Sequence, residues 1–134
     1  MKSVAKRVLV VDDETMIRHN VGDLLRSYGF AVTEAQDGAE VSRLAATENP
    51  DVIVMDVSMP RMDGFTAFRE LREDQATNHI PVVFLSNRND YELGANHDCD
   101  SIAQSTGVRA PEAFLDKPFE GRHLIREVFA ACGS

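Results

Sequence analysis

The sequence has little cysteine, no long hydrophobic run and no excess of basic residues. Its two cysteines, Cys99 and Cys132, are too few for a disulfide framework, and we expect both to be reduced thiols. No apolar run is long enough to cross a bilayer, and the first one reaches Asp12 too early to be the core of a signal peptide. The net charge of −8 argues against a nucleic-acid-binding face, which needs basic residues. We therefore expect a cytoplasmic protein that contacts neither membranes nor nucleic acid directly.

Length and composition predict one globular domain. The 134 residues are 43% hydrophobic and 27% charged, which provides enough apolar side chain for a core. Sequence patterns typical of strands, which are apolar runs or, at residues 30–35, an alternation, occur five times in turn with helical periodicity. We expect strands at residues 7–11, 30–35, 51–55, 80–85 and 113–116, and helices around residues 15–28, 41–48, 64–71, 100–106 and 124–129.

This alternation predicts an α/β fold. Repeated strand–helix units with short connections form a parallel sheet with helices on both faces. Five units in this length favour a flavodoxin-like, doubly wound five-stranded parallel sheet with strand order 2-1-3-4-5. The strand at residues 51–55 is the most continuously apolar one, so we place it centrally. Residues 86–112 follow no clear pattern, and the connection between the fourth and fifth strands is atypically long.

Five polar residues follow the predicted strands and point to one site. They are Asp12, Asp13, Asp56, Ser86 and Lys117. In such sheets the carboxyl ends of the strands meet at one edge, where ligands bind, and the switch point lies between the strands that end at Asp12 and Asp56. Three carboxylates there would repel one another unless a cation such as Mg²⁺ were bound. Asp13 and Asp56 are then the expected direct ligands, with Asp12 acting through water. The alternative reading is a set of solvated aspartates that cap helices.

Three stretches carry a resemblance to a known family, and they are Val8 to Glu14, Asp56 to Gly64, and Phe114 to Phe119. They resemble the first strand with its acidic pair, the phosphoacceptor strand with its following loop, and the Lys-Pro-Phe ending of the receiver domain of bacterial two-component response regulators. The resemblance covers almost the whole chain and is weakest from Asn87 to Glu112. It implies a single receiver domain over residues 1–134, with a core at about residues 5–131.

The resemblance implies a phosphorylation switch that is not an enzyme beyond its own phosphotransfer and dephosphorylation. Asp56 would accept a phosphoryl group from a histidine kinase or a histidine phosphotransfer protein, and the signal would pass to a downstream protein target. Mg²⁺ or Mn²⁺ would be held by Asp13, Asp56 and the backbone carbonyl of Ser58, with Asp12 nearby. Transfer of this kind depends on positioning and charge neutralisation.

The resemblance also assigns roles to residues around the acceptor. Lys117 and Ser86 would contact the phosphoryl oxygens. Phe114 matches the aromatic residue that turns inward as Ser86 moves toward the phosphate, and a phenylalanine of the core is the alternative reading. Asn87 and Arg88 depart from the family pattern, since a small residue is usual after Ser86.

Other functions stay open at this stage. A divergent receiver that acts as a phosphorylation-independent binding module is the alternative that Asn87, Arg88 and the long connection suggest. A hydrolase of the aspartyl-phosphate type would need a second acid two residues after the first, where this chain has Ser58. A nucleotide or flavin binder would need glycines or hydroxyls to cradle phosphate in the first loop, which is acidic here.

Overall fold

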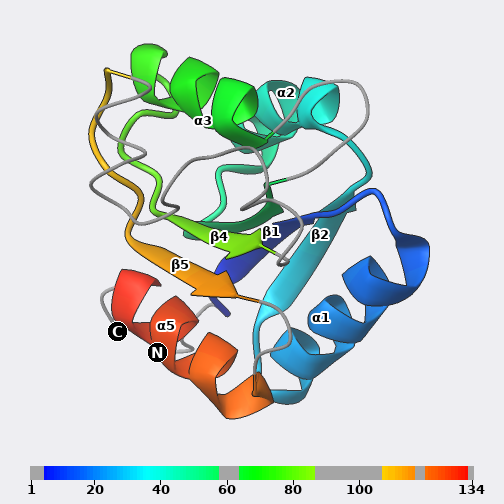
Figure 1. The fold of residues 1–134 in the computed structure, drawn as a ribbon. Helices are drawn as coiled ribbons and strands as arrows, with labels where there is room; N and C mark the ends of the chain where they lie inside the picture. Colours follow the sequence, from blue (N-terminus) through cyan, green and yellow to red (C-terminus); the bar gives the residue numbers. More distant parts are fainter. Residues whose placement is uncertain (1–4, 58–63, 87–106, 117–119, 133–134) are drawn as a thin grey trace.

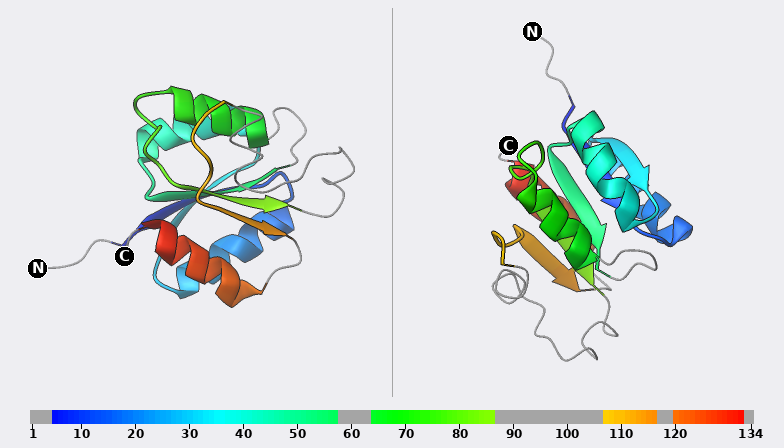
Figure 2. Two further views of the ribbon diagram at one scale, coloured as in Figure 1. Left: turned by 60° about the vertical axis from the view of Figure 1, so that its left-hand side comes forward. Right: turned by 90° about the horizontal axis from the view of Figure 1, so that it is seen from above.

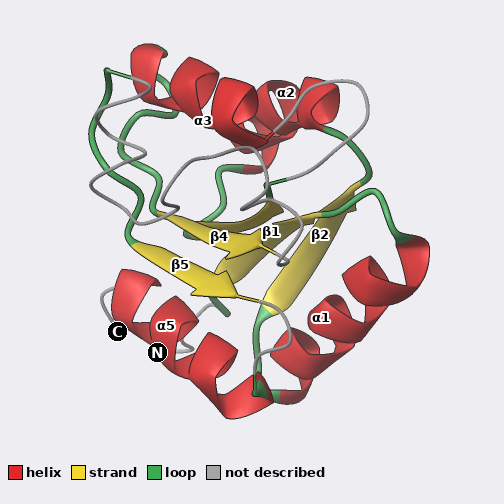
Figure 3. Cartoon of the chain, in the orientation of Figure 1, coloured by secondary structure: helices red, strands yellow, loops and turns green. Residues whose placement is uncertain are grey.

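The computed structural model describes residues 5–57, 64–86, 107–116 and 120–132, and its centre is a parallel sheet between two layers of helices (Figure 1, Figure 3). The strands are β1 (Arg7–Val11), β2 (Ala31–Ala35), β3 (Val52–Asp56), β4 (Val82–Ser86) and β5 (Ala113–Asp116). The helices are α1 (Thr15–Ser27), α2 (Gly38–Glu48), α3 (Gly64–Glu73) and α5 (Gly121–Cys132).

The five strands lie in the order β2-β1-β3-β4-β5 and all neighbouring pairs are parallel. This confirms the predicted flavodoxin-like, doubly wound sheet. Strand β3 takes the central position that its continuous apolar run predicted, and all five of its residues are buried. Strand β2 lies at one edge and is only partly buried. The carboxyl ends of β1 and β3 are therefore neighbours.

Each face of the sheet carries its own core. Helices α2 and α3 cover one face, while α1 and α5 cover the other (Figure 1, Figure 2). The register explains the division, because Val10, Val54, Val83 and Ala113 lie side by side across β1, β3, β4 and β5 and all belong to the α1–α5 core. Their sequence neighbours point to the opposite face, as side chains alternate along a strand.

The ends of the elements differ slightly from the predictions, for local reasons. Strand β2 begins after Phe30, because the Phe30 N–H donates to the Leu25 carbonyl (3.2 Å) and so closes the end of α1. Strand β4 begins after Pro81, which lacks an N–H for the ladder. Strands β3 and β4 each end one residue later than predicted, so Asp56 and Ser86 are the last residues of their strands.

Two helices are followed by residues with positive φ. Gly29 follows α1 with a φ of 92° and Asn49 follows α2 with a φ of 49°, a conformation that glycine and asparagine adopt most readily. Gly107 also has a positive φ, of 74°. The helix predicted at residues 100–106 lies outside the described residues, so it stays a prediction.

The sequence predicted reduced cysteines and no membrane-spanning segment. Cys132 is a free thiol, and burial raises its pKa; Cys99 lies outside the described residues. Among the residues that the structure describes, no helix is long and apolar enough to span a bilayer.

Candidate functional site

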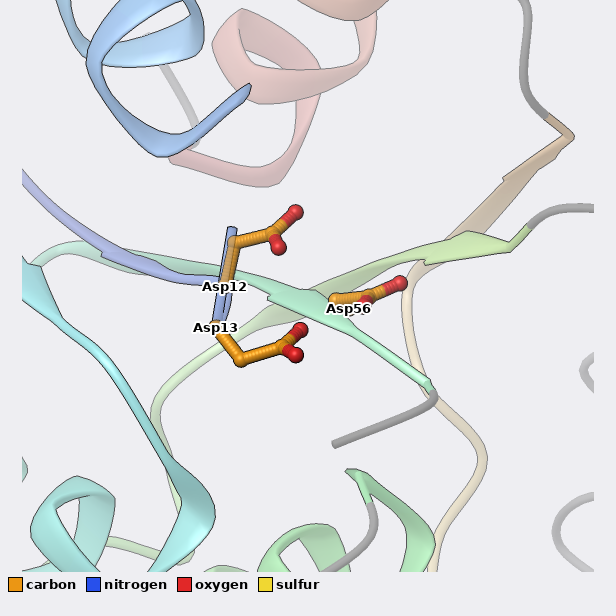
Figure 4. A group of neighbouring side chains, drawn as sticks. All are labelled: Asp12, Asp13 and Asp56. Atoms are coloured by element: carbon orange, nitrogen blue, oxygen red, sulfur yellow. The ribbon is translucent and has the colours of Figure 1, made fainter. Parts of the chain in front are cut away.

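Three aspartates meet at the carboxyl edge of the sheet. One oxygen from each of Asp12, Asp13 and Asp56 lies within 4.8 Å of the other two, and the three side chains reach toward one region (Figure 4). Asp12 directly follows β1, and Asp56 is the last residue of the neighbouring β3. Asp12 and Asp56 are 1% and 4% exposed, whereas Asp13 is exposed. The structure thus brings together the three carboxylates that the sequence predicted would meet.

A sharp turn after β1 allows two adjacent aspartates to share one site. The Asp12 N–H still belongs to the sheet, since it donates to the Ala35 carbonyl (3.1 Å). The side chain of Asp12 stabilises the turn that follows, because Asp12 Oδ1 accepts a hydrogen bond from the Glu14 N–H (2.9 Å). This is the local bond by which aspartate commonly forms turns. In an extended strand the two side chains would instead point to opposite faces.

A cluster of ions on α1 and β2 lies behind this turn. Arg18 Nη1 donates to the Asp12 carbonyl (2.9 Å), and Arg18 Nε donates to Glu34 Oε1 (3.1 Å). Glu34 also contacts His19 Nδ1 (2.9 Å) and Arg26 Nη2 (3.2 Å). Burial raises the pKa of Glu34, but the hydrogen bonds from Arg26, His19 and Arg18 outweigh it, and the pKa is lowered overall. We did not predict Arg18 or Glu34 as site residues, because their contact joins two elements and leaves no spacing pattern.

Helix α3 approaches the carboxyl end of β3 very closely at Gly64. The Gly64 N–H donates to the Val57 carbonyl (2.7 Å). A Cβ at Gly64 would lie 2.6 Å from the Asp56 carbonyl oxygen and 2.9 Å from Val57 Cα. Both are backbone atoms that cannot swing away, so only glycine fits here. Val57 is held in turn by donating its N–H to the Leu85 carbonyl (3.0 Å), which ties this end of β3 to β4.

Of the remaining predicted residues around the acidic cluster, the structure describes only some. Ser86 is fully buried at the end of β4, one residue beyond Leu85, which pairs with Asp56 in the register. Ser86 thus lies at the same edge of the sheet as the aspartates. Lys117 and Ser58 lie outside the described residues, as do the unusual Asn87 and Arg88.

Phe114 packs with the aromatic residues of the α2–α3 core. Its ring centroid lies 6.2 Å from that of Phe84, which also contacts Phe65 and Phe68. Phe114 is partly buried. The position fits a core phenylalanine, and the switching role stays a prediction.

The arrangement of the three carboxylates favours a bound hard cation. Negative charges this close repel one another, and the repulsion is strongest where Asp12 and Asp56 are shielded from water. Mg²⁺ prefers oxygen ligands and binds through few protein carboxylates while it keeps several waters. Exposed Asp13 leaves one side of the cluster open to such waters.

A family model described as response regulator receiver domain matches residues 8–129 of the chain. Protein PilH of Pseudomonas aeruginosa is 36% identical over 125 residues, which cover 92% of this chain and 95% of PilH. Response regulator PleD of Caulobacter vibrioides is 44% identical over 84 residues, which cover 62% of this chain but only 18% of PleD. The chain therefore spans nearly all of one relative and a small part of another.

Solved structures show the same fold. A putative response regulator from Chloroflexus aurantiacus has a TM-score of 0.82 at 24% identity, covering 98% of this chain and all (100%) of that one. The receiver domain of the sensor histidine kinase PA1611 from Pseudomonas aeruginosa has a TM-score of 0.80 at 28% identity, with coverage of 98% and 100%, and carries a magnesium ion coordinated in its active site cleft. The chemotaxis response regulator CheY4 of Vibrio cholerae has a TM-score of 0.78 at 28% identity, with coverage of 96% and 99%.

Proposed function

The chain belongs to the response regulator receiver domain family, and from this membership we propose that it is a signalling switch whose phosphoryl acceptor is Asp56. Receiver domains are switches and are not enzymes in the usual sense. The observation that carries the assignment is the cluster of Asp12, Asp13 and Asp56, with one oxygen of each within 4.8 Å of the others. Asp56 is the member that lies on the central strand of the sheet.

The proposed reaction is transfer of a phosphoryl group from a phosphohistidine. An oxygen of the Asp56 carboxylate forms a bond to phosphorus, the phosphorus–nitrogen bond breaks, and the released imidazole takes up a proton. The product is an acyl phosphate on Asp56. Catalysis of such a transfer comes mainly from positioning and charge stabilisation, and the fixed ends of β1 and β3 provide the positioning. Self-catalysed transfer and later hydrolysis of the acyl phosphate are the only reactions that we assign to the chain.

The site is suited to Mg²⁺ or Mn²⁺, which would neutralise charge on the phosphoryl oxygens. Asp13 and Asp56 would bind the ion directly, with Asp12 acting through water and the backbone carbonyl of Ser58 as a further ligand. The support is the oxygen-only, closely spaced donor set and the magnesium ion in the cleft of the PA1611 receiver domain.

Lys117 and Ser86 are proposed to contact the phosphoryl group, and Phe114 to follow Ser86 when it moves. The position of Ser86 at the end of β4, one residue beyond the register partner of Asp56, supports its role. The proposed partners are a histidine kinase or a histidine phosphotransfer protein as donor, and a downstream protein as target. We also propose that residues 1–134 form a single receiver domain. We place the switch in the cytoplasm, because the donor kinase obtains its phosphoryl group from ATP there.

Intact-mass spectrometry after incubation with acetyl phosphate tests the proposal. We expect the protein to gain one phosphoryl group with Mg²⁺ present and none after chelation of the metal. Asp56→Asn should abolish the gain, whereas Asp23→Asn, which alters an exposed aspartate of α1, should leave it intact. No gain in the unaltered protein would favour a phosphorylation-independent binding module instead.

A further inference from the structure

We propose that Arg18 is a positioning residue that holds the Asp12–Asp13 turn in its cation-binding shape. The inference rests on the proposed function, because it concerns the metal affinity of the same acidic site. Arg18 lies on α1, one turn after the aspartates, and its side chain is only 11% exposed. Such shielding restricts the guanidinium to the contacts that the protein provides.

The contacts of Arg18 join three elements at one point. Nη1 donates to the carbonyl of Asp12, just past the end of β1, and Nε donates to Glu34 on β2. Glu34 is itself held by Arg26 from the next turns of α1. The planar guanidinium has several donors in a rigid arrangement, so a single side chain spans both acceptors.

The Asp12 carbonyl, which accepts the hydrogen bond from Arg18, matters because of its place in the backbone. The carbonyl that Arg18 binds belongs to the peptide group that joins Asp12 to Asp13. A peptide group is planar and rigid, so fixing its oxygen fixes the direction in which Asp13 leaves the turn. Asp13 is the exposed member of the cluster, and packing restrains it less than the two buried aspartates. The hydrogen bond from Arg18 therefore orients Asp13, the aspartate that packing restrains least.

The charge of Arg18 and its positioning of the turn predict opposite changes in metal affinity when Arg18 is removed. A positive guanidinium near a cation site disfavours the cation, so a pure charge effect means that removing Arg18 strengthens metal binding. Glu34 pairs with Arg18 at 3.1 Å and offsets much of its charge. If the positional effect dominates, removing Arg18 weakens metal binding. Whether metal affinity rises or falls in the variant thus decides between the charge effect and the positional effect.

Arg26 provides a matched control on the same helix. It also contacts Glu34, through Nη2 at 3.2 Å, and its Nη1 contacts the exposed Asp23. Its side chain is 44% exposed and pairs with these two carboxylates. Replacing Arg26 removes one charge and one contact with Glu34, as replacing Arg18 does, but leaves the bond to the Asp12 carbonyl in place.

The test is the Mn²⁺ affinity of the full chain, measured from the electron paramagnetic resonance signal of the free ion. We expect Arg18→Met to weaken binding by about tenfold, as losses behind a metal ligand commonly do. Arg26→Met should stay within about twofold of the unaltered protein, because the turn is undisturbed. Thermal unfolding of both variants shows whether a loss of affinity merely follows a loss of stability.

Arg18→Lys keeps the experiment decisive if Arg18→Met fails to fold. Lysine retains the charge but cannot span both acceptors with a fixed geometry, so we expect affinity between those of the unaltered protein and Arg18→Met. Unchanged or tighter binding in the Arg18 variants, or equal losses in Arg18→Met and Arg26→Met, overturns the inference while the proposed function stands. An unaltered protein that binds no Mn²⁺ and accepts no phosphoryl group overturns both.

Discussion

Arg72 of α3 and Glu112, next to the start of β5, form an ion pair of 2.8 Å in which the Arg72 side chain is only 2% exposed. Arg72 Nη1 also donates to the Ile80 carbonyl (2.6 Å), and Nη2 to the Ala110 carbonyl (3.1 Å). Glu112 Oε1 accepts in addition from the Val82 N–H at the start of β4 (2.7 Å). One buried cation thus joins α3 to the amino ends of β4 and β5, opposite the acidic site.

Arg72→Met should destabilise the fold by about 2–4 kcal/mol, because it leaves the Ile80 and Ala110 carbonyls without this donor and removes the buried cation that pairs with Glu112. Burial lowers the pKa of Arg72, and Glu112 opposes that effect, so the group stays charged near neutral pH. Urea denaturation measures the loss. Arg69→Met, which alters an exposed arginine of the same helix, should change the free energy of unfolding little. Equal effects of the two substitutions would show that the buried network contributes nothing specific.

Gly64→Ala should lower the free energy of unfolding by about 1–3 kcal/mol, because the new Cβ would collide with fixed backbone. The nearest atom is the Asp56 carbonyl oxygen at 2.6 Å, so we also expect slower phosphorylation by acetyl phosphate. Gly22→Ala is the control, since its Cβ would meet mainly the end of the Arg26 side chain at 3.3 Å, which can move. A Gly64→Ala protein as stable and reactive as the control would contradict the close approach.

Glu34→Gln should reduce stability near neutral pH and have a smaller effect in acid. The folded-state pKa of Glu34 is lowered, so its stabilising contribution is present above its unfolded pKa of about 4.3 and is lost as the pH falls through the folded value. The difference in melting temperature between the variant and the unaltered protein should therefore narrow below about pH 4. A difference that stays constant from neutral to acidic pH would rule out the charge of Glu34 as its cause.

Asp13→Asn should weaken Mg²⁺ binding by about tenfold or more, because it replaces a proposed charged oxygen ligand by a neutral one. Phosphorylation by acetyl phosphate should slow in parallel at a fixed Mg²⁺ concentration. Glu14→Gln removes the same charge from the next residue, which is also exposed, and should have a much smaller effect. Calorimetric titration with Mg²⁺ compares the two variants, and similar losses would mean that only overall charge matters.

The sequence allowed the sheet to be predicted because β1, β3, β4 and β5 are apolar runs bounded by polar residues, while β2 alternates as a half-exposed strand does. The continuous apolar run of β3 predicted its central position, and the meeting of the aspartates at the ends of β1 and β3 followed from that strand order. The exact strand ends depended on single backbone bonds and on Pro81, and were off by one or two residues. Arg18 and Glu34 could not be found in this way, since their partners lie on other elements and the contact has no periodicity. The close approach at Gly64 likewise depends on how α3 packs.

Chemical trapping of the phosphorylated residue tests the central assignment most directly. Borohydride reduces an aspartyl phosphate to homoserine, and peptide mass spectrometry then locates the altered residue. After phosphorylation with Mg²⁺ present, we expect homoserine at position 56 and unaltered aspartate at positions 12 and 13. Homoserine at Asp12 or Asp13 in place of Asp56, or none in a protein that has gained the phosphoryl group, would contradict Asp56 as the acceptor.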